Sequence, residues 1–205
     1  MTRTLEKIQT TPPGAVGIAA GRSLTMAAIG LAMIVLSHVC ALAGPAPEYQ
    51  VKAAFLYNFA KFATFPPQAL PADTATFTIA VLGDDPFGTT LDQTVQGKTI
   101  ADRKIVVRRI DSADEAKHCQ LLFVCASHKK EYASILSRLK GQNILTVGES
   151  EGFATKGGMI NFYVEDNRVR FEINPKAADR AGIQISSQLL RLGRTVADEP
   201  ASNGS

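Results

Sequence analysis

Histidine, cysteine, serine and carboxylate side chains could do chemistry in this chain, and their spacing is the first test for an active site. His118 and His128 lie ten residues apart on either side of a predicted strand, too far apart to hold one metal ion together. The sequence has no HExxH or CxxC motif, and no carboxylates cluster with metal-ligand spacing. No serine has a general base in register, and Gly88 and Gly97 lack dinucleotide-loop spacing. We therefore expect no metal, no cofactor and no catalytic residue, and a binding protein rather than an enzyme.

Two glycine-containing segments are open to more than one interpretation. Gly83-Asp84-Asp85 follows a predicted strand, where an ion-binding or catalytic loop would lie, but a turn explains it as well. Gly157-Gly158 precedes another strand, where glycine lets a ligand or a backbone segment approach closely. A bulge or a tight turn would use the same glycines, and this is the simpler explanation.

Cys119 and Cys125 are the only cysteines after residue 43. The residues between them are predicted to form a buried strand, and six residues of strand span about 20 Å. A disulfide needs Cα atoms within about 7 Å, so we predict no internal bridge and two buried thiols that pack as small hydrophobic groups. A bridge to a second chain in a homodimer, or a reactive thiol, stays open as the alternative.

The first 43 residues have the layout of a secretory signal. Residues 24–43 form a nearly unbroken apolar run, Arg22 precedes it, and Ala41-Leu42-Ala43 supplies the small residues of a cleavage site. We predict a signal peptide over residues 1–43, a linker over 44–48 and an exported protein. The alternative is an anchor in the inner membrane through residues 24–43, because about 20 apolar residues can span a bilayer.

Charge excludes one class of partner. Of the 22 basic and 19 acidic residues, three basic and one acidic residue precede residue 44, which leaves a net charge of about +1 for the rest. Binding to nucleic acid through its phosphates needs a basic surface, so we expect no nucleic-acid partner. The 205 residues, 45 % hydrophobic and 20 % charged, suit a leader and one globular domain.

The elements that would hold these residues alternate between strands and helices. Apolar, β-branched runs predict buried strands, and amphipathic spacing with glycine or proline stops predicts helices. We expect strands over residues 76–82, 104–110, 120–125 and 144–147, and helices over 48–62, 89–95, 130–140 and 176–192, the last with an interruption at Gly182. A final hairpin is expected over 159–165 and 168–173. This order predicts an α/β fold with a mostly parallel mixed sheet, a C-terminal β-hairpin and a last helix.

Two patterns predict which side chains are buried. In the first helix, Val51, Phe55, Phe59 and Phe62 recur at spacings of four, four and three, so we expect this aromatic stripe in the core. In the hairpin, apolar and polar residues alternate on both arms around an Asp166-Asn167 turn, which predicts one buried and one wetter face.

Three segments together resemble the YfiR-like family, which includes HmsC-type proteins. The first is VKAAFLYNFAKF, residues 51–62, followed by Pro66-Pro67. The second runs from Gly152-Phe153 to GGMINF, residues 157–162. The third is RVRFEIN, residues 168–174, with SSQLL, residues 186–190, behind it. The resemblance extends over residues 49–194 and leaves residues 195–205 as a tail predicted to be disordered.

The resemblance implies a periplasmic three-layer α/β/α sandwich without catalytic activity. It implies binding to the periplasmic sensor domain of a membrane-anchored diguanylate cyclase, which lowers cyclic di-GMP and biofilm formation. The family-motif residues, with either a structural or a partner-binding role, would be Asn58, Phe62, Gly157, Gly158, Asn161, Phe171 and Asn174. Relatives use cysteine pairs as a redox element, which the spacing of Cys119 and Cys125 opposes here. Two other functions stay open: a ligand-binding sensory module for another membrane protein, such as a histidine kinase, and an enzyme with an unrecognised site.

Overall fold

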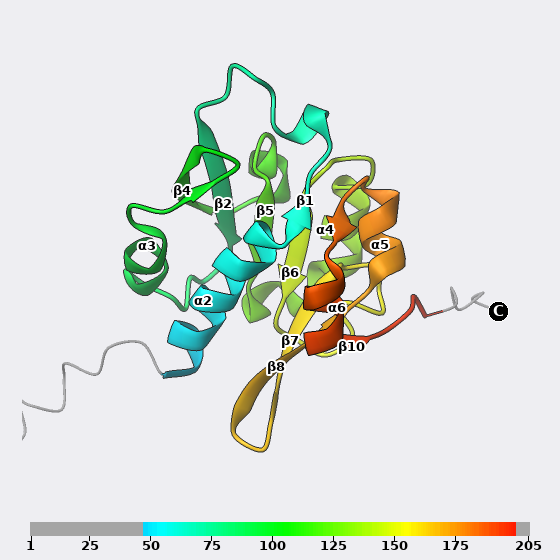
Figure 1. Cartoon of the computed structure of the whole chain (residues 1–205). Coiled ribbons are helices and arrows are strands. Elements are labelled where there is room, and N and C mark those ends of the chain that lie inside the picture. Colours follow the sequence, from blue (N-terminus) through cyan, green and yellow to red (C-terminus); the bar gives the residue numbers. More distant parts are fainter. Residues whose placement is uncertain (1–46, 200–205) are drawn as a thin grey trace, which may run out of the picture. The chain divides into compact units, whose positions relative to one another are not determined.

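The structure, a computed structural model, describes residues 47–199 (Figure 1). The predicted signal peptide, most of the predicted linker and the end of the predicted tail lie outside the described residues. The helices are α2 (Pro47–Lys61), α3 (Thr90–Val95), α4 (Tyr132–Arg138), α5 (Pro175–Arg180) and α6 (Ser187–Leu192), with short 3-10 turns η2 (Pro67–Ala69), η3 (Ala113–Ala116) and η4 (Ala126–Glu131). None of the helices in this part of the chain is long and apolar enough to cross a membrane.

The strands form one large sheet and one small sheet. They are β1 (Ala63–Thr64), β2 (Thr76–Leu82), β3 (Thr99–Ile100), β4 (Arg103–Ile110), β5 (Leu121–Val124), β6 (Leu145–Gly148), β7 (Ile160–Glu165), β8 (Arg168–Ile173), β9 (Gln184–Ile185) and β10 (Arg194–Thr195). The large sheet has eight strands in the order β10-β8-β7-β6-β5-β2-β4-β3, and β1 pairs with β9 separately. Only β7–β8 and β3–β4 are antiparallel within the large sheet. The predicted α/β fold with a mostly parallel mixed sheet is confirmed.

The central strands are apolar on both faces because both faces are covered. β5 and β6 are buried at every position, and β2 is buried at all but its first residue. Such continuous burial is typical of parallel strands with helices on both sides of the sheet. β2 has the bounds that its sequence predicts.

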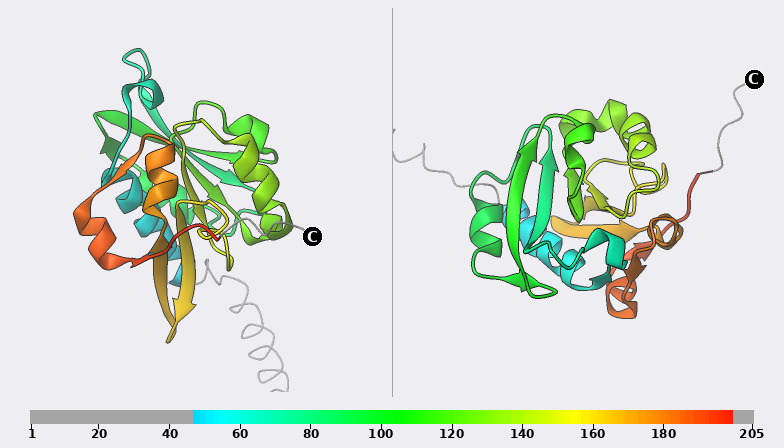
Figure 2. Two further views of the ribbon diagram at one scale, coloured as in Figure 1. Left: turned by 90° about the vertical axis from the view of Figure 1, so that its right-hand side faces the viewer. Right: turned by 90° about the horizontal axis from the view of Figure 1, so that it is seen from above.

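Two apolar clusters lie on opposite sides of the sheet. The larger one joins the sheet to α2, α3, α5 and α6, and includes Phe59, Leu91 and Leu189. The smaller one joins it to η3 and α4, and includes Ala116, Tyr132 and Phe153. Seen from above in Figure 2, the sheet is curled as a half-barrel, with α2 on its inner side.

The β7–β8 hairpin extends beyond the body of the domain (Figure 1). Asp166 and Asn167 both have positive φ, 51° and 57°. A two-residue hairpin turn with positive φ at both positions matches the twist of the strands it joins. The predicted turn is therefore confirmed.

The prediction of one helix over residues 176–192 is wrong. α5 ends at Arg180, and Gly182 follows with φ +69°. The N–H of Ile183 donates to the carbonyl of Ala178 (3.0 Å) and that of Gly182 to Asp179 (2.9 Å), which is the pattern of a Schellman motif. The chain then forms β9, and the Ser186 hydroxyl caps α6 by accepting from the Leu189 N–H.

The prediction that Val51 belongs to a core stripe is also wrong. Val51 is 43 % exposed, whereas Ala53, Leu56, Phe59 and Ala60 are fully buried. α2 therefore turns the face that contains Leu56 and Ala60 toward the sheet, and Phe55 and Phe62 pack at its margin.

Candidate partner-binding surface

The family-motif residues occupy three separate places in the fold. Phe171 is buried under α2, with ring centroids 5.3 Å from Phe55 and 4.9 Å from Phe59. Phe62 packs at the margin of the same cluster. Asn58 is half-buried on α2, and its carbonyl accepts the Phe62 N–H at 2.9 Å. This first group holds α2 against β8.

The second group closes the loop between β6 and β7. Asn174 is fully buried, caps α5 by accepting from the Ala177 N–H (3.1 Å), and donates to the carbonyl of Ala154 (2.8 Å). A Cβ atom at Gly158 would lie 2.3 Å from the Phe153 ring, and Gly157 has φ +101°. Close packing and backbone conformation thus explain both glycines without a ligand.

Asn161 belongs to a buried polar group on the hairpin. It was expected on the wetter face, together with Glu172, but the two residues are only 2 % and 6 % exposed. The Asn161 amide donates to Glu172 (3.3 Å), whose other oxygen accepts from Arg194 on β10 (2.5 Å). Both side chains are thus buried, so the predicted alternation between buried and wet faces is wrong at these two positions.

Cys119 and Cys125 are free and buried. Their thiols pack in different clusters, on opposite sides of the sheet. Burial raises the pKa of Cys119 to about 12. Burial and the negative charge of Glu149 also raise the pKa of Cys125 to about 12. Both sulfurs therefore stay protonated at neutral pH, which makes them poor nucleophiles.

A buried ion pair anchors α2 where the parallel strands end. Lys52 of α2 contacts Glu149, which follows β6, with 2.9 Å between Nζ and Oε2, and both side chains are only 4 % exposed. Glu149 also accepts hydrogen bonds from the Tyr49 hydroxyl (3.2 Å) and from the Ala126 N–H (3.0 Å). The sequence predictions did not include this network. The one available signal was that Lys52 lies four residues before Leu56, on the inward side of the helix.

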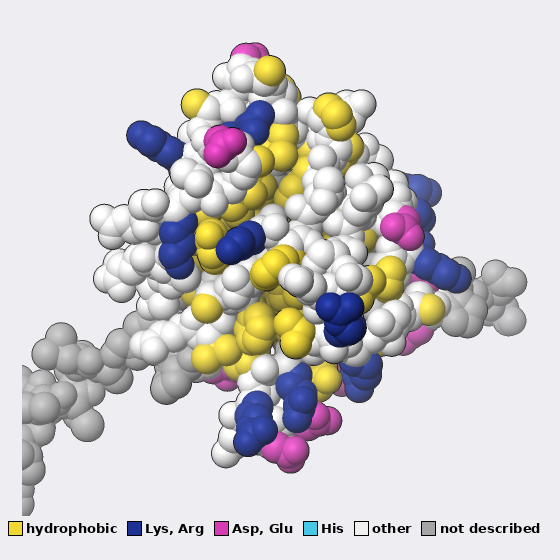
Figure 3. Space-filling view, viewed as in Figure 1, with side chains coloured by type: hydrophobic (Ala, Val, Ile, Leu, Met, Phe, Trp, Pro, Cys, Tyr) yellow, Lys and Arg dark blue, Asp and Glu magenta, His cyan; other side chains and the backbone are white. Residues whose placement is uncertain are grey.

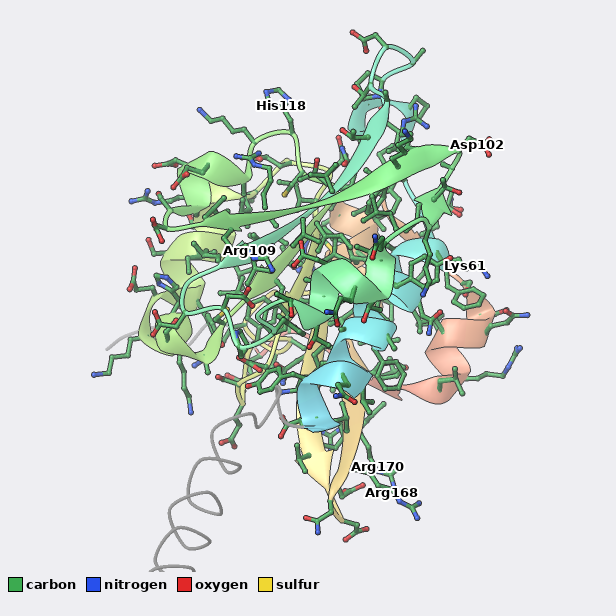
Figure 4. The ribbon with its side chains drawn as sticks, turned by 90° about the vertical axis from the view of Figure 1, so that its left-hand side faces the viewer. Lys61, Asp102, Arg109, His118, Arg168 and Arg170 are labelled. Atoms are coloured by element: carbon green, nitrogen blue, oxygen red, sulfur yellow. The ribbon has the colours of Figure 1, made fainter. Side chains whose placement is uncertain are left out.

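The Gly83–Asp85 loop is a turn that an ion pair with Arg109 of β4 holds in place. The Arg109 guanidinium contacts Asp85 (2.9 Å) and forms two bonds to Asp92 of α3 (2.5 and 3.0 Å). The hydrogen bond from Arg109 lowers the pKa of the Asp92 carboxyl. Figure 4 shows Arg109 between the strand and α3. These contacts hold the loop and α3 together. Among residues 47–199, no group of three or more histidine, cysteine or carboxylate side chains could hold a metal.

The expectation of no catalytic serine included the absence of a G-x-S-x-G pattern, and this is wrong, because residues 148–152, G-E-S-E-G, have that pattern of a nucleophile elbow. That motif needs a helix after the serine and a histidine base beside it. Turns follow Ser150, and over the described part of the chain no histidine hydrogen bonds to it. A Cβ at Gly148 would lie 2.3 Å from the Phe153 ring, so packing explains that glycine.

One exposed surface combines apolar side chains with a rigid support, and we name it the helix–hairpin face. It comprises Val51 and Phe55 on α2, Val164 on the hairpin and Leu192 on α6. Val164 is 53 % exposed and Leu192 is 74 % exposed. Figure 3 shows apolar side chains gathered between α2 and α6, above the charged side chains of the hairpin. In Figure 4, Arg168 and Arg170 lie near the hairpin end, away from the body of the domain.

Such a surface can bind a protein without further chemistry. Phe55 packs edge-to-face against buried Phe171, and α2 is held by the Lys52–Glu149 pair, so the apolar residues are presented on fixed elements. Exposed apolar residues with a charged rim are typical of protein interaction sites.

Comparison with known proteins identifies the family of the chain. Residues 49–194 match the protein family described as YfiR/HmsC-like. No curated protein matches the chain. A solved structure described as the ABC domain in complex with L-Trp from Streptococcus pneumonia is similar, with a TM-score of 0.50 and 13 % identity over 70 % of this chain. The match covers 60 % of that structure's chain, and at this identity it shows the fold alone.

Proposed function

Because the chain belongs to the YfiR/HmsC-like family of periplasmic regulators of diguanylate cyclases, we propose that it binds the periplasmic sensor domain of a membrane-anchored diguanylate cyclase and represses that enzyme. The family is regulatory and non-catalytic. Repression lowers cyclic di-GMP and biofilm formation.

The observation that supports the proposal is the helix–hairpin face. Repression across a membrane requires that the protein bind the inactive sensor conformation more tightly than the active one. A tenfold shift between the two conformations needs about 1.4 kcal/mol of differential affinity. Leu192 is 74 % exposed, and burial of one leucine side chain supplies about 1.5–3 kcal/mol. Contact by this face in one sensor conformation only would therefore be sufficient.

Deletion of the gene, followed by measurement of cellular cyclic di-GMP, tests the proposal. Deletion should raise cyclic di-GMP and matrix production, and the full chain should restore both. Leu192→Asp and Val164→Asp should fail to restore them, because these changes place a charge in the apolar contact. Lys140→Asp, an exposed change on the α4 side, should restore them fully.

Two further measurements accompany this test. N-terminal sequencing of the periplasmic protein should begin at or near Gly44, and a chain without residues 1–43 should stay in the cytoplasm and fail to restore repression. Unchanged cyclic di-GMP after deletion, in cells that express a membrane cyclase, would contradict the proposal and favour a sensory module for another membrane protein.

A further inference from the structure

We propose that the outer edge of β4 binds an extended, acidic segment of a partner protein by strand addition. This edge is distinct from the helix–hairpin face, and the inference does not depend on the proposed function. β4 has eight residues, but β3 pairs only with its first two, through Thr99↔Lys104 and Ile100↔Arg103. Residues 105–110 therefore have no strand on their outer side within the described chain. In Figure 4, β4 crosses the front of the molecule between Asp102 and Arg109.

The backbone of this edge is ready to pair. The Lys104 N–H donates to the Ala75 carbonyl (3.3 Å), and the Ile110 carbonyl accepts from the Gly83 N–H (3.2 Å). The backbone N–H and C=O groups of the even-numbered residues of β4 therefore point toward β2. The peptide groups of Ile105, Val107 and Arg109 consequently point away from the sheet. Unpaired N–H and C=O groups on an edge strand form a template for a further strand.

A groove beside the edge has room for the side chains of such a strand. It measures about 790 Å³ and lies between α3, the loop after it and β4. Val95, Ile105 and Val107 line it with apolar surface, and Lys98 lies at its border. On the opposite face of β4, Val106 is 40 % exposed. An added strand would therefore find apolar contacts on both of its faces.

The basic side chains on β4 favour an acidic segment as the added strand. Lys104 and Arg108 flank Val106 on the exposed face of β4, and no acidic residue lies in β4. The one carboxylate that lines the groove, Asp92, is already held by Arg109. A second copy of β4 would bring its own lysine and arginines to this edge, where like charges on paired strands are destabilising. An acidic segment would pair with Lys104 and Arg108 instead.

The spacing on β4 predicts the pattern of the segment. Residues that face each other on paired strands share one face of the sheet. Because Thr99 already lies opposite Lys104, an added strand can lie opposite residues 105–109 only. Acidic residues opposite Val106 and Arg108 would lie within reach of Arg108 and, diagonally, of Lys104. The residues that alternate with them would lie over the groove and should be apolar.

A designed peptide tests the inference on protein purified from the periplasm of cells that express the full chain. The peptide has five residues, with glutamates at its second and fourth positions and valines at its first, third and fifth; the control peptide has lysines in place of the glutamates. Hydrogen exchange measured by NMR should show that the glutamate peptide slows exchange at the amides of Ile105, Val107 and Arg109. The lysine peptide should have no such effect.

Two variants separate strand addition from other modes of binding. Val107→Pro removes an outward N–H that has no partner among residues 47–199, and proline is tolerated on edge strands. It should weaken peptide binding by on the order of tenfold or more, because a ladder bond is lost and the ring blocks the edge. Lys104→Glu with Arg108→Glu should reverse the preference toward the lysine peptide, and Lys130→Glu, exposed on η4, should change nothing.

Three results would overturn the inference. The first is equal binding of both peptides, and the second is protection of amides elsewhere but not on β4. The third is a dimer that Val107→Pro converts to a monomer, which would mean that two copies pair through this edge.

Discussion

Loss of the Glu149 charge should destabilise the fold far more than loss of an exposed glutamate charge. Glu149→Gln leaves the Lys52 ammonium, whose side chain is 4 % exposed, without its buried partner. Removal of one member of a buried ion pair costs about 3–5 kcal/mol. Glu48, 39 % exposed, still contacts Lys52 at 2.5 Å. We therefore expect a loss near the lower end, about 3 kcal/mol in the free energy of unfolding.

Urea unfolding followed by circular dichroism measures this loss. For a domain of this size it corresponds to a melting temperature lower by about 6–12 °C. Glu131→Gln is the matched control, because the Glu131 carboxylate lies 3.3 Å from His128 Nδ1 but the side chain is 64 % exposed. Exposed pairs contribute about 0–1 kcal/mol, so this variant should unfold almost like the original protein.

A double variant identifies the physical cause. Lys52→Met in the Glu149→Gln background removes the buried charge that has lost its partner, so the double variant should be more stable than Glu149→Gln alone. A loss below about 1 kcal/mol for Glu149→Gln would refute this account of the anchor on α2, as would a double variant no more stable than the single one.

The remaining predictions concern cysteine, packing and alkaline pH. Because burial raises the pKa of Cys119 and Cys125, iodoacetamide at pH 8 should modify neither thiol in the folded protein and both after unfolding; rapid labelling of the native state would contradict this. Gly158→Ala places a Cβ 2.3 Å from the Phe153 ring and should cost about 1–3 kcal/mol in thermal melts, with a smaller cost in a Phe153→Leu background. Burial and the Glu149 carboxylate raise the pKa of Tyr49 above 10.0. The stabilising contribution of the protonated Tyr49 hydroxyl is therefore complete below about pH 10 and is lost as the pH rises through the folded-state pKa. Tyr49→Phe should flatten that loss in urea titrations, and an unchanged slope would argue against the hydrogen bond between Tyr49 and Glu149.

The elements of this fold could be predicted because their signals are local. The run TFTIAVL has the composition of a buried strand, and β2 has the predicted bounds. Asp166 and Asn167 tolerate positive φ, and both adopt it. A pattern of two or three residues is sufficient for such features, because turn chemistry and side-chain alternation act between near neighbours. The prediction of the last helix was wrong for a local reason as well, since Gly182 ends α5 with a Schellman motif instead of merely interrupting a longer helix.

The faces and surfaces could not be predicted, because they depend on which elements become neighbours. Lys52 and Glu149 are 97 residues apart in the sequence and meet only after α2 packs across the ends of β5 and β6. Val51 and Val164 have the spacing of core residues, yet both are exposed, because α2 is rotated and the hairpin extends past the helices.

The edge of β4 likewise combines a feature that the sequence predicts with one that only the tertiary structure decides. Its sequence, RKIVVRRI, predicts a strand but does not reveal whether that strand lies at the centre or the border of the sheet. The strand order decides this, since β3 covers only two of its residues. The sequence alone therefore determined the long strands and the hairpin, the near-neutral charge after residue 43 and the family resemblance. Only the tertiary structure decided which side chains are buried and which surfaces are free to bind, because burial depends on contacts between segments far apart in the chain.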